Sequence, residues 1–232
     1  MAEQILQEVY RKSPEEVISY DWADVRDGTG YAVFYGGNMA GTTYTSPNTF
    51  YSGLLTKNGE TVTCAPANTY VLALDFDWDI IFNNPKDIFG DILTSIPFGI
   101  KVVSATTDTF TFYTDLLVYH YDGVTETQIG STATSEVIQQ SNSEAGDIIS
   151  SISTLKVNAS TVKHFKEGDI LRFTMKLYVK CSEVNKTAIG GIGCDPMNRS
   201  DDLLPTTVPA VYQVIKTNYP TQLKFQIPFR TN

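Results

Sequence analysis

Residues 170–179 alternate between apolar and polar side chains with a period of two. The apolar set is Leu171, Phe173, Met175, Leu177 and Val179. Successive side chains of an extended strand point to opposite faces, so this alternation predicts a strand with one buried face. A turn at residues 166–169 leads into the strand, and residues 223–229 repeat the alternation. The pattern is typical of antiparallel sheets, which are commonly packed on one side only.

Other strands are predicted where β-branched and aromatic residues run between turn residues. They are expected at residues 31–35, 70–82, 100–103, 110–113, 116–121, 125–129 and 148–157. Residues 54–62 predict a hairpin about Asn58-Gly59, a dipeptide that favours two-residue turns. The segments without a strand pattern are a helical turn at 86–93, a polar loop at 139–146 and an irregular connection at 188–209. The fold class is therefore an all-β antiparallel sandwich, of the jelly-roll kind.

The N-terminal segment follows a helical period instead. The apolar positions at that spacing are Ile5, Leu6, Val9 and Tyr10. Ser13-Pro14-Glu15-Glu16 then predicts the start of a second short helix, to about Tyr20. A stripe this narrow does not stabilise an isolated helix, so the arm must pack on its own domain or on a neighbouring subunit. We expect a helical arm at residues 1–20 and a sandwich domain at residues 21–232, with an alternative boundary near residue 98.

Composition narrows the function. An apolar fraction of 42% is enough for a packed core. The net charge is −9 and no basic patch offsets it, so nucleic acid is not an expected partner. No apolar run reaches the roughly 18 residues of a membrane helix, so no membrane partner is expected, and the N-terminus lacks the features of a signal peptide. The chain has 3 cysteines, too few for a disulfide framework, so reduced thiols are favoured.

The acidic segment Asp75-Phe76-Asp77-Trp78-Asp79 is the most prominent candidate for chemistry. Alternation places the three carboxylates on one face of a strand, as weak candidates for calcium binding. A straight strand spaces them about 7 Å apart, however, whereas calcium needs oxygens that converge from a curved loop. The favoured interpretation is a solvated acidic face that also opposes edge-to-edge pairing. A glycoside hydrolase would need two acids across a shaped cleft, which this pattern does not provide.

Other catalytic patterns are absent. The chain has 2 histidines, His120 and His164, with no metal-ligand spacing around them. No nucleophile elbow is present. Gly190-Gly191-Ile192-Gly193 lacks the ending of a phosphate loop and is interpreted as a flexible loop. We therefore expect no enzyme activity and no cofactor.

A tyrosine-rich stretch provides the third candidate surface. It contains Tyr31, Tyr35, Tyr44, Phe50 and Tyr51 among glycine, threonine and asparagine. Tyrosine among small polar residues suits adaptable contacts and stacking against sugars. Burial in the sandwich explains many of these residues equally well.

Three stretches in residues 100–232 resemble the β-sandwich and jelly-roll virion proteins of tailed viruses of bacteria and archaea, which decorate heads or build tails and fibres. They are Phe165-Lys166-Glu167-Gly168-Asp169, Cys194-Asp195-Pro196-Met197-Asn198-Arg199 and Gln226-Ile227-Pro228-Phe229-Arg230. The resemblance carries no catalytic residues. It implies symmetric homo-oligomers, trimers included, contacts through arms and long loops, and in some members binding to the host surface.

The expected function is therefore that of a virion structural protein, a capsid decoration or tail component, which binds other virion proteins and its own copies. It is expected in the virion, after assembly in the host cytoplasm. The expected interface residues are Ile5, Leu6, Val9 and Tyr10 of the arm and Cys194, Asp195 and Arg199 of the loop. The alternative is a carbohydrate-binding module for host glycans, which uses the tyrosines and calcium at Asp75, Asp77 and Asp79. A hydrolase ranks last, because no base or nucleophile can be assigned.

Overall fold

The computed structural model describes residues 17–19, 29–36, 49–50, 59–193 and 223–230. Several expected features lie outside these ranges: Ile5, Leu6, Val9 and Tyr10 of the arm, the loop residues Cys194, Asp195 and Arg199, and Tyr44 and Tyr51.

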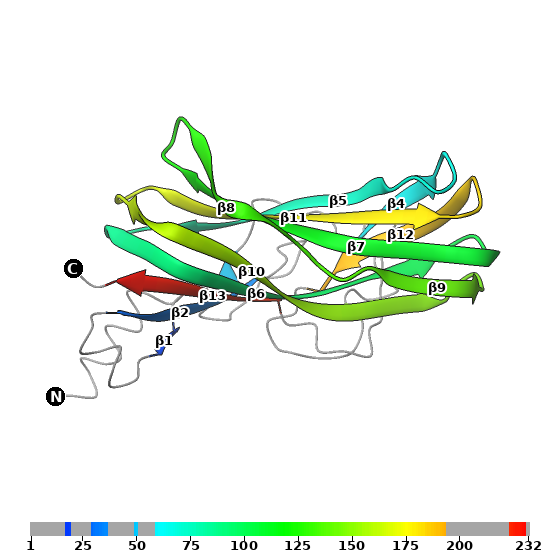
Figure 1. Cartoon of the computed structure of the whole chain (residues 1–232), viewed down its shortest axis with the longest axis horizontal. Coiled ribbons are helices and arrows are strands. Elements are labelled where there is room, and N and C mark those ends of the chain that lie inside the picture. Colours follow the sequence, from blue (N-terminus) through cyan, green and yellow to red (C-terminus); the bar gives the residue numbers. More distant parts are fainter. Residues whose placement is uncertain (1–16, 20–28, 37–48, 51–58, 194–222, 231–232) are drawn as a thin grey trace.

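The described residues form two β-sheets (Figure 1). The eight-stranded sheet contains β1 (Val17–Ser19), β2 (Thr29–Gly36), β3 (Thr49–Phe50), β4 (Gly59–Cys64), β6 (Lys86–Val102), β10 (Ile148–Phe165), β12 (Lys186–Ile192) and β13 (Leu223–Arg230). The five-stranded sheet contains β5 (Val71–Ile81), β7 (Thr106–Tyr121), β8 (Glu126–Thr134), β9 (Ile138–Ser143) and β11 (Ile170–Cys181). The pairings are antiparallel apart from the short β2–β3 contact. None of the described segments forms a helix long and apolar enough to span a membrane.

Strand β6 is the centre of the larger sheet. β10 pairs along one edge of β6, while β12 and β13 share the other edge. β12 continues to β4, and β13 continues to β2 and β1. In the smaller sheet β11 lies between β5 and β7, and the far edge of β7 pairs with β8 at one end and β9 at the other.

The two sheets pack face to face as a sandwich through large aromatic side chains. Phe173 of β11 lies 4.4 Å from Phe225 of β13 between ring centroids, and Phe98 of β6 lies 5.8 Å from Phe112 of β7. All four rings are buried. Each such side chain stabilises the fold by roughly 1.5–3 kcal/mol through the apolar surface it removes from water. The sheets are therefore held together by the apolar faces that the alternation predicts, including those at residues 170–179 and 223–229.

Strand β6 corrects the expected helical turn at residues 86–93. Its inward side chains include Ile88, Ile92 and Thr94, at a period of two. Gly90 lies between Ile88 and Ile92 with a φ of 112° and has no side chain, which leaves a gap in the apolar set. That gap hides the strand period in the sequence, while pairing with β10 along almost the whole length of β6 maintains the strand.

Two connections that we expected to be irregular also contain strands. The polar loop at 139–146 is in large part β9, whose side chains are mostly exposed and carry no apolar alternation. The start of the connection at 188–209 belongs to β12, which pairs with both β4 and β6. Gly190 is needed there because a Cβ atom would lie 2.7 Å from Leu177 Cδ2 of the facing sheet. Gly190 therefore permits close approach of the sheets, and Gly190-Gly191-Ile192 lies in a strand and not in a flexible loop.

The second N-terminal helix, expected up to Tyr20, is also wrong where the structure describes it. Val17–Ser19 form β1 and pair with β2. Val17 and Ile18 are β-branched, which favours strands over helices. The helix-start signal at Ser13-Pro14-Glu15-Glu16 lies outside the described residues and stays a prediction.

Candidate functional site

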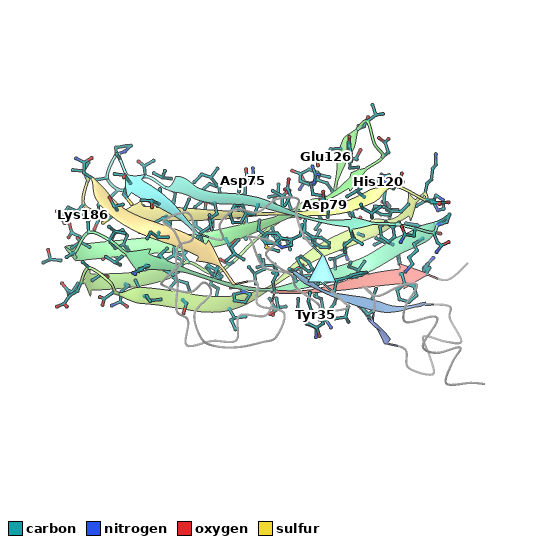
Figure 2. The ribbon with its side chains drawn as sticks, turned by 180° about the vertical axis from the view of Figure 1, so that it is seen from behind. Tyr35, Asp75, Asp79, His120, Glu126 and Lys186 are labelled. Atoms are coloured by element: carbon teal, nitrogen blue, oxygen red, sulfur yellow. The ribbon has the colours of Figure 1, made fainter. Side chains whose placement is uncertain are left out.

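The outer face of the five-stranded sheet carries the acidic strand β5. Phe76, Trp78 and Ile80 point into the sandwich, as the alternation predicts, and the three aspartates point outward. Register sets three pairs with β11: Asp75 with Lys176, Asp77 with Thr174 and Asp79 with Arg172. Figure 2 shows Asp75, Asp79 and Glu126 on this layer, opposite Tyr35 of the other sheet.

Arg172 joins three strands of this face. Its Nε and Nη2 atoms donate to the two carboxylate oxygens of Asp79, each at 2.8 Å, and its Nη1 atom donates to Glu126 of β8 at 3.0 Å. The planar guanidinium matches a carboxylate in this two-pronged way. The hydrogen bonds that Arg172 donates to Asp79 raise the pKa of Arg172 further above its ordinary value. Arg172 is 26% exposed, so this network is more shielded from water than a typical surface ion pair.

The other two aspartates have partners as well. The hydroxyl of Thr174 donates to Asp77 at 2.6 Å, and Lys176 Nζ lies 3.3 Å from Asp75. Burial acts to lower the pKa of Lys176, but the hydrogen bond and charge of Asp75 outweigh it, and the pKa is raised. Each carboxylate of β5 is therefore matched by a donor on β11.

This pairing bears on the calcium candidates Asp75, Asp77 and Asp79. Within the described ranges no group of three or more His, Cys, Asp or Glu side chains is placed to hold a metal ion. Calcium at this strand would require the carboxylates to converge and to leave their partners on β11. Calcium binding stays a prediction, and the strand geometry gives it no support.

Tyrosines gather at the end of this face near the turn between β4 and β5. The Tyr113 ring stacks on Tyr178 at 5.1 Å, and Tyr70 meets Tyr113 edge-on at 4.8 Å. Lys180 Nζ lies 4.7 Å from the centroid of Tyr70, and Leu72 beside them is 45% exposed. Burial raises the pKa of Tyr70 and Tyr113, so both hydroxyls stay protonated. Tyrosine and apolar side chains in one patch are typical of protein contact surfaces.

The tyrosine-rich stretch that the sequence emphasised is only partly described. Tyr31 and Tyr35 lie on the outer face of β2, where Tyr31 is 37% exposed and Tyr35 is half-buried. They belong to the opposite sheet from the Tyr70, Tyr113 and Tyr178 patch, as the position of Tyr35 in Figure 2 indicates. The structure therefore places the described aromatic candidates on two different faces.

Both histidines are paired with aspartates. His120 Nε2 lies 2.7 Å from Asp169, and His164 Nδ1 lies 2.6 Å from Asp87. The backbone N–H of Lys166 and then the His120 side chain lower the pKa of Asp169. The His120 ring also packs on Phe165 of the facing sheet at 4.4 Å. The His120 contacts tie the two sheets together at the end opposite the tyrosines, whereas the His164–Asp87 pair joins β10 to β6 within the larger sheet.

The two described cysteines are also buried. Cys64 and Cys181 are free thiols with 0% exposure, and burial raises the pKa of Cys64 to about 11. A thiol that is buried and protonated is a poor nucleophile. Cys64 therefore lacks the setting of a catalytic nucleophile.

Sequence reasoning identified the aspartates of β5 but missed their partners. Arg172, Thr174 and Lys176 are the polar positions of the same alternation that predicted β11. Their spacing of two matches that of the aspartates, a signal that could have suggested cross-strand pairing. The pairing of β5 with β11 could not be read from the sequence, because nearly 100 residues separate the partners, as for Thr174 and Asp77 at 97.

No protein-family model matches the chain, and no curated protein matches it. Solved structures similar to it include a CocE/NonD family hydrolase from Staphylococcus aureus, with 9% identity, 75% of this chain and 36% of that chain covered, and a TM-score of 0.32. The infectious bursal disease virus Gx strain matches with 8% identity, coverage of 89% and 37%, and a TM-score of 0.29. The VP2 subviral particle of infectious bursal disease virus matches with 7% identity, coverage of 89% and 42%, and a TM-score of 0.27. The chain spans 36–42% of the length of these structures, and likeness at this level carries no argument about its activity.

Proposed function

We propose that the protein is a non-catalytic virion structural subunit, a capsid decoration or tail component, that works by binding its own copies and other virion proteins. Its place is in the virion, after assembly in the host cytoplasm. The observation that carries the proposal is the outer face of the five-stranded sheet, where ionisable groups pair with one another and tyrosines lie beside exposed leucine. Such a face offers contact area and no group poised for proton transfer.

The order of the strands supports a jelly roll for this subunit. We take the strands in chain order from β4 to β12 and count β8 and β9 as one interrupted strand. In the larger sheet the first strand (β4) pairs with the eighth (β12), the eighth with the third (β6), and the third with the sixth (β10). In the smaller sheet the second strand (β5) pairs with the seventh (β11), the seventh with the fourth (β7), and the fourth with the fifth (β8 with β9). This is the order of a jelly roll, a fold used by viral capsid and lectin domains.

A pair of matched variants tests the contact face. Leu72→Asp introduces a charge beside the tyrosines, whereas Val124→Asp introduces the same charge at a side chain 89% exposed in the turn between β7 and β8. By light scattering we expect the unmodified protein to form a defined oligomer, a trimer in the simplest case. We expect Leu72→Asp to weaken it by about tenfold or more and Val124→Asp to leave it unchanged. A protein that stays monomeric at every concentration would contradict self-assembly, and equal masses for both variants would remove this face from the contact.

The arm and the loop are proposed as further contacts. Deletion of residues 1–20 removes Ile5, Leu6, Val9 and Tyr10 together with the short strand β1. We expect it to reduce the mass of the oligomer while the β-sheet circular dichroism of the remaining strands persists. Substitution of Asp195 and Arg199 by alanine tests the loop in the same assay. Unchanged assembly in both variants would restrict the contact to the sheet face.

A further inference from the structure

A cleft of about 490 Å³ opens at the end of the sandwich where Lys186 lies (Figure 2). Three turns form it: the one between β6 and β7, the one between β9 and β10, and the one between β11 and β12. Its lining is Ala105, Thr106, Thr107, Asn142, Ser143, Glu144, Glu183 and Lys186. The lining contains no aromatic side chain, unlike a typical small-molecule pocket.

One wall of the cleft is held in place by its own hydrogen bonds. Lys186 Nζ donates to Ala105 O at 2.7 Å and pairs with Glu183 at 2.9 Å. The second oxygen of Glu183 accepts from the Thr106 hydroxyl at 2.8 Å. Hydrogen bonds from Lys186 and then Thr106 lower the pKa of Glu183, so it stays ionised. Both of its oxygens are used, and its charge is offset by Lys186.

The opposite wall has groups without such partners. Asn142 adopts a positive φ of 52°, which holds the turn at the end of β9. The backbone N–H of Glu144 donates to Asp147 at 2.7 Å, which fixes the start of the Glu144 side chain. Among the described residues, neither the Asn142 amide nor the Glu144 carboxylate has a hydrogen-bond or ion-pair partner. The Ser143 hydroxyl also lacks one, but it lies beneath the surface, so Asn142 and Glu144 are the groups that a guest can reach.

The charge and geometry of this wall select a cation with several N–H groups. Of the charged residues in the lining, Glu183 and Lys186 pair with each other, which leaves the charge of Glu144 without an opposite charge. The side chain of Asp147 lies next to the backbone of Glu144. The guanidinium of arginine is planar, donates in two parallel directions and binds carboxylates in that way, and it accepts no hydrogen bonds. It is also weakly hydrated for a cation and is enriched at the centres of protein interfaces.

We propose that this cleft receives an arginine side chain of a neighbouring protein subunit, with Glu144 as its carboxylate partner and Asn142 as an accepting amide. The proposal rests on the assembly function above and names the chemistry of the partner. The fixed wall of Thr106, Glu183 and Lys186 shapes the cleft, and Glu144 supplies the attraction.

The test uses Nα-acetyl-arginine amide as the probe and two-dimensional NMR of the full chain as the readout. The chain carries Leu72→Asp, which weakens the oligomer and leaves the cleft open to the probe. We expect saturable shifts at the amides of residues 142–144 with the arginine probe. We expect none with the citrulline analogue, which has the same shape without the charge. Glu144→Gln should weaken binding by about tenfold, the size of one charge-assisted hydrogen bond. The matched control is Glu167→Gln, at an exposed position in the turn between β10 and β11 at the other end of the sandwich, which should bind normally.

The outcomes separate this inference from the proposed function. Absent shifts, equal shifts with citrulline, or full binding by Glu144→Gln would each overturn the arginine site. The same result would follow if methyl glycosides shifted these amides as strongly, because the cleft would then be a sugar site. Light scattering of the same samples reports assembly separately. If the unmodified protein is an oligomer but the Leu72→Asp chain does not bind the probe, the function is kept and the site is removed. If the unmodified protein is a monomer and the probe binds, the site is kept and self-assembly is removed.

Discussion

Carboxylates on the outer sheet face and in the cleft have the same chemistry but different surroundings. Asp75, Asp77 and Asp79 each meet a donor on β11 because antiparallel register repeats every second residue on both strands. Glu144 sits in a turn, where no neighbouring strand supplies a partner at a fixed spacing. The difference indicates that paired acids hold the sheet together, whereas an unpaired acid in a fixed turn is available to bind.

Among the substitutions that test this comparison, loss of Arg172 should have the largest effect on the free energy of unfolding. Arg172→Ala removes the donors to Asp79 and Glu126 and leaves their negative charges close to Asp77. Because Arg172 is partly shielded, we expect a loss of about 2 kcal/mol in the free energy of unfolding, between the values for exposed and buried pairs. Urea denaturation measures it. Lys156→Ala serves as the control. It breaks the pair of Lys156, which is 60% exposed, with Asp91, which is 36% exposed, and should change the free energy of unfolding little. Equal losses in both variants would show that the face gains nothing from the network.

Ser143→Ala should raise stability by about 1 kcal/mol. The Ser143 hydroxyl is buried without a partner among the described residues, and burying such a group costs free energy that alanine avoids. Thermal unfolding measures the change. Thr114→Ala provides the contrast, since the buried Thr114 hydroxyl donates to Lys176 O at 3.1 Å and its loss should be destabilising. A drop in melting temperature for Ser143→Ala would mean that its hydroxyl has a bonding role.

Asp169 lies at the end of the sandwich away from the cleft. Its carboxylate should make the free energy of unfolding depend on pH under acidic conditions. Its pKa is lowered in the folded state, so the folded protein holds the ionised form more strongly than the unfolded chain does. This contribution is complete above the unfolded pKa of about 3.9 and is lost as the pH falls through the lower folded value. Denaturation midpoints between about pH 5 and pH 2 measure it. We expect a shallower acid dependence in Asp169→Asn than in Asp108→Asn, which alters an exposed aspartate.

Glu144→Gln should have the smallest effect on stability, within about 0.5 kcal/mol, because its carboxylate has no partner to lose among the described residues. Urea denaturation of the free protein measures this. A larger loss would show that Glu144 is part of the folded network after all and would remove the contrast between turn and sheet.

Much of the strand content followed from local pattern. The strands at residues 170–179 and 223–229 were predicted because one whole face of each is apolar. Strand β9 was missed because its side chains are mostly exposed, and β12 because its glycines are typical of loops as well as of close sheet contacts. In these two strands the backbone pairing of distant residues decides the structure, and no local preference reports it.

In the candidate site, too, some residues could be predicted from the local sequence and others could not. Its acids could be located from Asp75, Asp77 and Asp79 alone, together with the face they share. Their neutralisation by β11 and the meeting of Tyr70, Tyr113 and Tyr178 depend on pairings between strands far apart in the chain. The cleft was not predicted, since Glu144, Glu183 and Lys186 come from turns whose closeness only the folded sandwich creates.

Which side of each regular strand faces the core follows from the amino-acid sequence alone, because the side-chain period of a strand is a local property of the chain. The acidic character of the surface follows from the sequence as well, through a net charge of −9. Which charges neutralise one another and which remain available depends on the folded sandwich. Strand register and the approach of separate turns are set by packing across the whole sandwich, so they appear only when both sheets are in place.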